Sequence, residues 1–187
     1  MLPPVIRCIN VSGMSFADRN GPNYHAPWTY MTMARCALHN ILQDESRVLY
    51  LDADTIVMFD VSELFETDLK GNVIGAVREP ARCLDPFVYF NAGVLLMDLD
   101  QLRGGLGDDM LRLLNTRKLR CVDQDAINLL CQARILELNP IYNANDYTAV
   151  PGNAKIYHYA GDGRYAERRL FKSYIDMKWS EINARKE

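Results

Sequence analysis

The chain has 187 residues, of which 49% are apolar and 24% are charged, and its formal net charge at pH 7 is −3. This is the composition of an ordinary folded protein, so it argues against a disordered or fibrous chain. The near balance of 21 basic and 24 acidic residues gives no electrostatic footprint for nucleic acid. An anionic substrate would therefore have to be bound by local donors or by a metal ion.

In chain order, the hydrophobic pattern predicts a strand over 3–11, turns over 12–27, a helix over 29–43, a strand over 47–51 and a short helix over 60–69 that Asp60 caps. Strands over 72–77 and 87–99 follow, the second interrupted at residues 91–93, and then helices over 107–118 and 123–132, the latter capped by Asp123. A strand over 133–138, a loop over 139–153, a strand that starts at residue 154 and a charged helix over 166–187 complete the chain. This alternation indicates a single α/β domain over residues 1–187 with a mostly parallel sheet.

Cysteine usage and the absence of long apolar runs predict the compartment. The five cysteines are an odd number and include no C-x-x-C pair, which favours reduced thiols over a disulfide framework. The proline-interrupted opening does not resemble a signal peptide, and no apolar run approaches the ~20 residues of a membrane span. We therefore expect a cytoplasmic protein.

The stretch VLYLDADTIV places Asp52 and Asp54 directly after an apolar strand. Residues i and i+2 of an extended chain point to the same side, so both carboxylates could face one divalent cation, either Mg²⁺ or Mn²⁺. His158, which ends another short apolar segment, is the candidate third ligand, and its nitrogen would favour Mn²⁺. The residues alone leave other interpretations open: the aspartates as turn or cap residues, and His158 as a structural histidine.

Four segments in this order, RVLYLDADTIV, YFNAGVLLMDL, DQDAIN and HYAGDGRY, resemble the family 8 retaining glycosyltransferases, which include glycogenin and bacterial lipopolysaccharide galactosyl- and glucosyltransferases. The resemblance extends from about Val5 to Tyr165. It implies an α/β nucleotide-diphospho-sugar transferase fold called GT-A, with a Rossmann-like mixed sheet flanked by helices. It also implies metal-dependent, retaining transfer of a hexose from a UDP-sugar to a hydroxyl of a glycan or lipopolysaccharide, with Mn²⁺ (or Mg²⁺) as the cofactor.

The same resemblance assigns roles to individual residues. The metal ligands that it implies are Asp52, Asp54 and His158. The positions that it implies for donor binding are Arg35, Ala53, Ala92, Gly161 and Arg164, the last two on the phosphates, where a glycine lets main-chain amides approach and an arginine offsets charge. The positions that it implies at the reaction centre are Asn91, Asp123 and Gln124.

The sequence also departs from the family pattern. Arg164 stands where the family usually has lysine, and only 51 residues precede Asp52, without a counterpart of the first nucleotide-binding strand. We therefore expect an N-terminally shortened fold, for which a homo-oligomer is one consequence and a non-catalytic or fragmentary binding domain is the alternative function. The aromatic and basic segment 166–187 leaves peripheral membrane contact open beside the simpler expectation of a packed surface helix.

A second enzyme class shares the aspartate pair. Phosphohydrolases of the haloacid-dehalogenase type also carry Asp-x-Asp after an apolar strand, which would make Asp52 the nucleophile and Asp54 the general acid and base. That interpretation leaves the segments YFNAGVLLMDL and DQDAIN unexplained.

Overall fold

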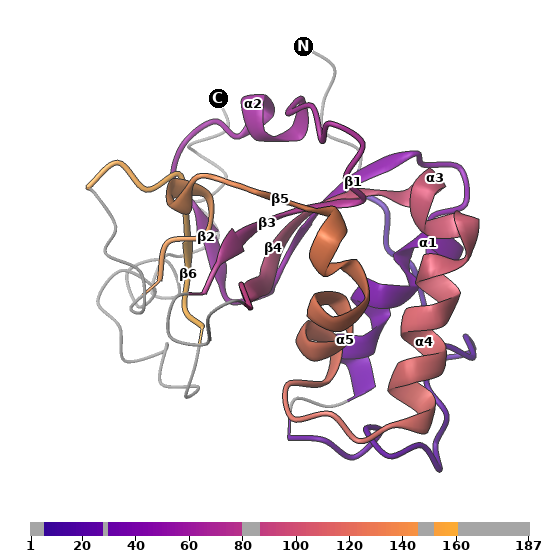
Figure 1. Cartoon of the computed structure of the whole chain (residues 1–187). Coiled ribbons are helices and arrows are strands. Elements are labelled where there is room, and N and C mark those ends of the chain that lie inside the picture. The colour runs from indigo at the N-terminus through magenta and orange to yellow at the C-terminus, as the bar shows by residue number, and fades with distance from the viewer. Residues whose placement is uncertain (1–5, 28–29, 80–86, 146–151, 161–187) are drawn as a thin grey trace, which may run out of the picture. The chain divides into compact units, whose positions relative to one another are not determined.

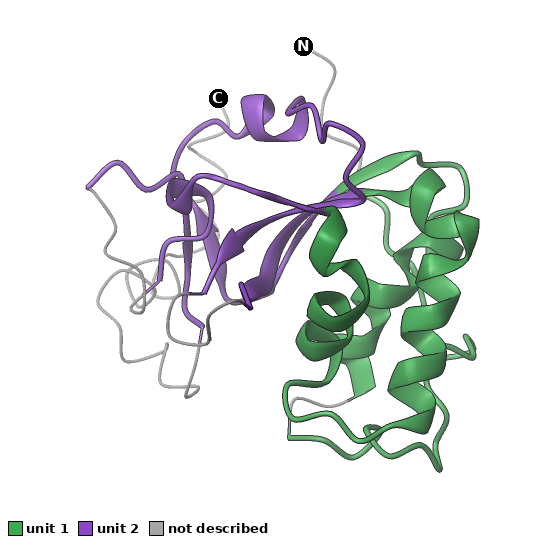
Figure 2. Cartoon of the chain, in the orientation of Figure 1, with its two compact units in different colours: residues 1–48, 98–134 green, residues 49–97, 135–187 purple. Residues whose placement is uncertain are grey.

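A computed structural model of the chain describes residues 6–27, 30–79, 87–145 and 152–160 (Figure 1). The chain divides into two compact units, which are coloured separately in Figure 2. Unit 1 comprises residues 1–48 and 98–134, and unit 2 comprises residues 49–97 and 135–187. The single domain expected over 1–187 stays a prediction, and the helix expected over 166–187 lies outside the described residues.

Unit 1 is built from helices. They are η1 (Tyr30–Ala37), α1 (Leu38–Ile41), α3 (Leu99–Gln101), η3 (Leu102–Leu106), α4 (Gly107–Thr116), α5 (Val122–Cys131) and η4 (Gln132–Arg134). Their apolar faces bury a core that includes Met33, Met110 and Ile127. In α4, Asp108 and Asp109 lie in the first turn, where acidic side chains favour the helix dipole.

The described part of unit 2 contains two sheets. Its elements are β1 (Arg47–Leu51, which starts in unit 1), β2 (Thr55–Val57), α2 (Ser62–Phe65), β3 (Ile74–Arg78), β4 (Phe90–Asp98, which ends in unit 1), β5 (Ile135–Glu137), η5 (Pro140–Tyr142) and β6 (Ile156–His158). The larger sheet has the order β1-β4-β3-β5, and β2 pairs with β6 in the smaller one. A core cluster of six buried residues packs in this unit: Leu64, Val77, Val94, Leu138, Tyr142 and Ile156.

The larger sheet is mixed, as the family resemblance implies. Strand β3 is antiparallel to β4, with Ile74 opposite Met97, and parallel to β5, with Ile74 opposite Ile135. The expectation of a mostly parallel sheet, which came from the alternation of strands and helices, is wrong at the β3–β4 pair. Alternation of elements does not fix the direction in which two neighbouring strands run, and mixed sheets are common in α/β folds.

Strand β4 continues through residues 91–93, but its pairing with β3 is irregular there, where the sequence predicted an interruption. The Asn91 side chain accepts a hydrogen bond from the Gly93 main-chain N–H (2.9 Å). Ala76 lies opposite Leu95 and Arg78 lies opposite Phe90, so two steps along β3 correspond to five along β4. The extra residues of this irregularity therefore lie on β4, between Phe90 and Leu95.

Three local predictions need correction. The described part of the strand expected over 3–11 has no regular structure, and Ile6 is 85% exposed, because an apolar run forms a strand only where packing partners support it. The helix expected over 29–43 is mostly the 3₁₀ helix η1. Asp123 lies inside the first turn of α5, and Cys121 occupies the N-cap position.

Asp60 supplies a capping bond although Val61 occupies the N-cap position of α2. The Ser62 N–H donates to Asp60 Oδ1 at 2.8 Å. Within the described part of the chain, no helix combines the length and apolar character that a bilayer crossing requires.

Candidate functional site

The two aspartates lie in a tight turn between β1 and β2. The Asp52 N–H donates to the Gly93 carbonyl on β4 at 2.8 Å, and the Thr55 N–H and hydroxyl both donate to the Asp52 carbonyl, at 3.1 and 2.8 Å. The turn therefore rests on main-chain contacts, which leave the carboxylates of Asp52 and Asp54 half-buried rather than enclosed.

Strand pairing brings His158 to this turn. Strands β2 and β6 are antiparallel with Thr55 opposite His158, and the Tyr159 N–H donates to the Asp54 carbonyl at 3.0 Å. Although more than a hundred residues separate the aspartates from the histidine, the two-stranded sheet makes them neighbours.

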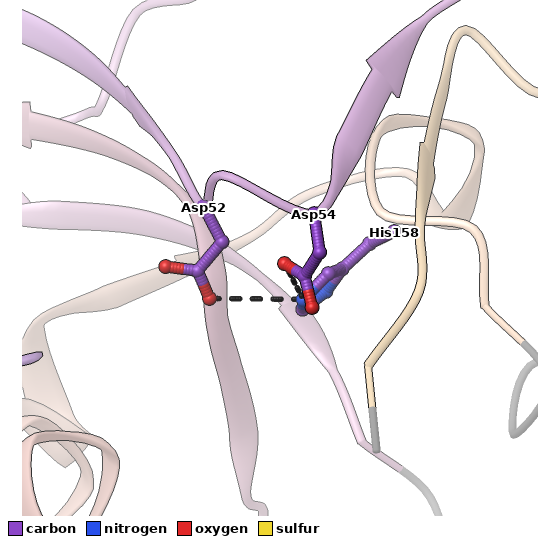
Figure 3. A group of neighbouring side chains, drawn as sticks. All are labelled: Asp52, Asp54 and His158. Carbon is purple, nitrogen blue, oxygen red and sulfur yellow. Dashed lines mark ion pairs between the residues drawn. The ribbon is translucent and has the colours of Figure 1, made fainter. Parts of the chain in front are cut away.

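The three side chains form a group that fits a divalent metal ion (Figure 3). His158 Nε2 lies 3.6 Å from Asp52 Oδ2 and 3.4 Å from Asp54 Oδ1, and one ligand atom from each residue lies within 4.8 Å of the others. Ligand atoms bonded at about 2.1 Å in an octahedral shell lie about 3 Å apart, so only small shifts would enclose an ion. Two carboxylate oxygens and one imidazole nitrogen suit Mn²⁺, and the oxygens also suit Mg²⁺.

Gly93 on β4 makes room for the imidazole. A Cβ atom at this position would lie 2.0 Å from His158 Cε1 and 2.5 Å from Nδ1, which is far closer than non-bonded atoms approach. The absence of a side chain at residue 93 is therefore a condition for the position of His158.

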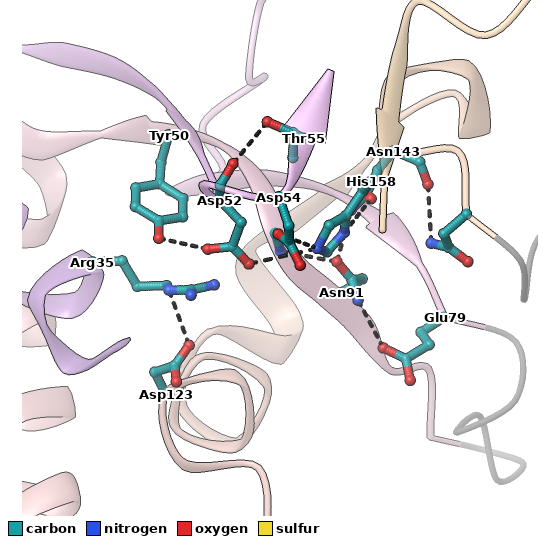
Figure 4. A network of polar contacts seen from close by, with 12 residues as sticks. Arg35, Tyr50, Asp52, Asp54, Thr55, Glu79, Asn91, Asp123, Asn143 and His158 are labelled. Atoms are coloured by element: carbon teal, nitrogen blue, oxygen red, sulfur yellow. Dashed lines mark hydrogen bonds and ion pairs between the residues drawn. The ribbon is translucent and has the colours of Figure 1, made fainter. Parts of the chain in front are cut away.

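A chain of hydrogen bonds continues from His158 into the interior of unit 2 (Figure 4). His158 Nδ1 lies 2.9 Å from Asn143 Oδ1, and Asn143 Nδ2 donates to Asn91 Oδ1 at 2.8 Å. Asn91 Nδ2 in turn donates to Glu79 Oε2 at 3.1 Å. All four residues are buried. The sequence prediction included Asn91, with a role at the reaction centre, but missed Glu79 and Asn143.

Asp52 has a hydrogen-bonding neighbour of its own. The Tyr50 hydroxyl donates to Asp52 Oδ1 at 2.6 Å (Figure 4). Tyr50 is the residue two before Asp52 in β1, so the alternation of side chains along a strand was the one signal that could have identified it.

Unit 1 holds a second group of predicted residues. Arg35 Nε on η1 lies 3.0 Å from Asp123 Oδ2 on α5, and both side chains are buried (Figure 4). Val122, just before Asp123, has a φ of 40°, which is strained for a β-branched residue. Gln124 lies next in the helix, where its N–H donates to the Cys121 carbonyl at 2.9 Å.

The predicted site residues thus fall into two groups that are described separately. Unit 2 brings Asp52, Asp54, His158 and Asn91 into one network, and unit 1 pairs Arg35 with Asp123. Ala53 is exposed within the aspartate turn, and Ala92 is buried in β4. Gly161 and Arg164 lie outside the described residues.

Comparisons with known proteins point to one class. The chain is 32% identical to the glycosyltransferase GlyF of Streptococcus pneumoniae over an alignment 199 positions long, which covers 95% of this chain and 49% of that protein. It is 34% identical over 111 residues to lipopolysaccharide 1,2-glucosyltransferase of Escherichia coli, covering 52% of this chain and 33% of that protein. The chain spans half the length or less of these curated relatives.

The fold agrees with these comparisons. The crystal structure of the glycosyltransferase GlyE of Streptococcus pneumoniae superposes with a TM-score of 0.68 at 27% identity, covering 84% of this chain and 45% of that one. This similarity confirms the predicted GT-A fold.

The family profile described as "Glycosyl transferase family 8" matches residues 3–164. This match covers the segments that a haloacid-dehalogenase-type phosphohydrolase would leave unexplained, so that interpretation of the aspartate pair is not supported. The chain belongs to glycosyl transferase family 8.

Proposed function

We propose that this chain transfers a hexose from a UDP-sugar to an acceptor hydroxyl of a glycan or lipopolysaccharide, with retention of the anomeric configuration and with a divalent metal ion. The observation that carries the proposal is the Asp52–Asp54–His158 group in a chain of family 8. The alternative is a glycosyltransferase-like domain that binds a donor without transferring it, since the chain covers only part of its relatives.

Asp52, Asp54 and His158 are the residues that would hold Mn²⁺ or Mg²⁺. Such an ion, when bound, offsets the negative charge that grows on a diphosphate leaving group. The carboxylates keep solvent access because they are half-buried, whereas the imidazole is held from behind by buried polar groups. An open face with a fixed back suits a site whose ion must also contact a substrate.

The remaining roles concern the donor sugar and its phosphates. Asp123 and Gln124 would bind sugar hydroxyls, and Arg35, through its ion pair, would orient the Asp123 carboxylate. Gly161 and Arg164 would bind the phosphates, the first through main-chain amides and the second through its guanidinium group.

The experiment that tests this proposal follows the donor by proton NMR. UDP-glucose and UDP-galactose are incubated with the chain in Mn²⁺ and in EDTA, with simple sugars as acceptors and with water as the default acceptor. We expect UDP release in the presence of Mn²⁺ but not in EDTA. The first sugar product should keep the α configuration of the donor.

The matched control is Asp54→Ala, which should release no UDP. Donor binding that requires Mn²⁺ but leads to no turnover of either donor would favour the binding domain over the transferase. A first product of β configuration would contradict the retaining assignment.

A further inference from the structure

We propose that Asn143 is a positioning residue that fixes the tautomer of His158, so that the imidazole presents its Nε2 lone pair to the aspartate pair. The inference deepens the proposed function, since it concerns the metal site on which that function rests. It depends on which group donates and which accepts in each hydrogen bond of the series that joins Glu79, Asn91, Asn143 and His158. These directions can be derived one after another, starting at Asn91.

The direction is set at Asn91. The Gly93 main-chain N–H can only donate, and it donates to Asn91 Oδ1 at 2.9 Å. The opposite side of the same amide faces Glu79 Oε2 at 3.1 Å, where a carboxylate oxygen accepts from Asn91 Nδ2. Reversing the Asn91 amide would place its NH₂ group against an N–H and its oxygen against a carboxylate, so both contacts define a single orientation.

The orientation of the Asn91 amide fixes the orientation of the Asn143 amide. Because Asn91 Oδ1 is an acceptor, the group 2.8 Å from it must be the NH₂ group of Asn143. The carbonyl oxygen of Asn143 then lies on the other side, 2.9 Å from His158 Nδ1. An oxygen that can only accept requires a proton on Nδ1.

The proton on Nδ1 determines what Nε2 offers. In a neutral imidazole with Nδ1 protonated, Nε2 carries a lone pair. Here Nε2 lies 3.6 Å from Asp52 Oδ2 and 3.4 Å from Asp54 Oδ1. A lone pair and two carboxylates that converge on one point repel one another, and a cation placed among them turns this repulsion into coordination.

Burial makes the arrangement obligatory. Asn143 has no exposed surface, and Glu79, Asn91 and His158 are 8%, 7% and 4% exposed. Polar groups this deep in a protein must bond to one another because bulk water does not reach them. The ring of His158 also has no freedom to turn away, since it packs against Gly93.

The first test reads the tautomer of the metal-free wild-type chain by long-range proton–nitrogen NMR at a pH where the ring is neutral. The chain has three histidines, and the signals absent from His158→Gln identify the ring. We expect the proton on Nδ1 of His158. A proton on Nε2 would overturn the inference.

The second test measures Mn²⁺ affinity without any nucleotide, by calorimetry and by the electron paramagnetic resonance signal of free Mn²⁺. Asn143→Leu keeps the size of the side chain but removes its oxygen, and it should weaken Mn²⁺ binding on the order of tenfold to a hundredfold. Asn143→Asp keeps an acceptor for the Nδ1 proton and should recover most of this loss. Unchanged affinity in Asn143→Leu would contradict the proposal.

Asn23→Leu is the matched control. Asn23 is also a fully buried asparagine, but it belongs to unit 1 and bonds to the main chain of Leu114, Arg117 and Leu119. It should lower stability without changing Mn²⁺ affinity. If Asn143→Leu does not fold, the tautomer of the wild-type chain decides alone.

The two proposals fail in different ways. A chain with the Nδ1 proton that turns over no UDP-sugar would leave this inference intact and remove the transferase. A chain that turns over UDP-sugars with the proton on Nε2 would do the reverse.

Discussion

Some single residues that would not contact a bound metal ion position the side chains that would bind it. Tyr50 donates to one oxygen of Asp52, which orients that carboxylate and leaves Oδ2 as the oxygen nearer to His158. Gly93 gives the imidazole its place. Loss of a neighbour of this kind commonly lowers metal affinity by roughly tenfold to a hundredfold, because such groups fix the orientation of each donor atom.

Tyr50→Phe tests the first of these contacts. The substitution removes the hydroxyl that donates to Asp52 Oδ1 and keeps the ring, so Mn²⁺ affinity should fall on the order of tenfold while the fold is retained. Calorimetry with Mn²⁺ measures the change. Tyr24→Phe is the control, because Tyr24 lies in unit 1, where its ring stacks on that of Tyr30; a loss of affinity of the same size in both variants would contradict the role of Tyr50.

Gly93→Ala tests the second contact. The added methyl would overlap the imidazole of His158, so the ring or the strand must move, and we expect loss of Mn²⁺ binding together with lower thermal stability. Gly152→Ala in the same unit adds a methyl that meets nothing within 4 Å and should leave both properties unchanged. Wild-type Mn²⁺ affinity in Gly93→Ala would show that the ring is not confined as described.

At the scale of elements, Glu63 on α2 joins three segments of unit 2. Its carboxylate accepts a hydrogen bond from the Tyr142 hydroxyl on η5 and pairs with Lys155, just before β6, at 2.5 Å. Tyr142 also packs in the core cluster beside Ile156 of β6. This contact therefore helps to hold the strand that ends at His158.

The contact makes stability depend on pH. The hydrogen bonds from Lys155 and Tyr142 lower the pKa of the Glu63 carboxyl below its usual 4.5, and burial, followed by the bond to Glu63, raises the pKa of Tyr142 to about 12. A carboxyl with a lowered pKa stabilises the fold above its unfolded-state pKa, and this contribution disappears as the pH falls through the folded-state value.

The wild type should therefore be more stable than Glu63→Gln at neutral pH, and the difference should disappear as the pH falls below 4.5 and through the lowered pKa of Glu63. Urea unfolding of both chains across this range measures it. A difference that is independent of pH would mean that the charge of Glu63 is not what the two donors stabilise.

Prediction from sequence succeeded where the signal is local. The apolar run before Asp52 predicts a strand, and the amphipathic pattern of α4 predicts a helix, each from neighbouring residues alone. Both elements lie where they were expected. The candidate ligands Asp52, Asp54 and His158 were predicted from their places at the ends of apolar segments and from the family resemblance. The structure brings these three side chains together, and their role as metal ligands stays a prediction.

The supporting network could not be predicted in the same way. Its bonds join residues 12, 52 and 15 positions apart, between Glu79 and Asn91, Asn91 and Asn143, and Asn143 and His158. No periodicity connects such positions, because the pairing of strands and the path of a loop decide them. The same reason explains the error at Asp123, which an ion pair with Arg35 holds inside the first turn of α5.

Across the molecule as a whole, the cysteines differ in burial and therefore in expected reactivity. The four cysteines among the described residues are free thiols. Cys36 and Cys131 are buried in unit 1, and burial raises the pKa of Cys131 to about 12 and that of Cys36 well above its usual value. Cys8 is exposed. A thiol that is both buried and protonated is a poor nucleophile.

Alkylation of the native chain with iodoacetamide, followed by peptide mass spectrometry, should therefore label Cys8 quickly and leave Cys36 and Cys131 unmodified. The same reaction in urea should label all three. Native labelling of Cys36 at the rate of Cys8 would contradict the burial of η1 in unit 1.

The proposed chemistry of this chain depends on Asp52, Asp54 and His158 holding a divalent ion against the diphosphate of UDP. The most direct measurement is calorimetric titration of UDP into the chain, first with Mn²⁺ and then with EDTA, for the wild type and for Asp54→Ala and His158→Ala. We predict binding by the wild type in Mn²⁺ alone, and none by either variant, with circular dichroism spectra unchanged. UDP affinity that is the same in EDTA, or the same in either variant, would contradict this role.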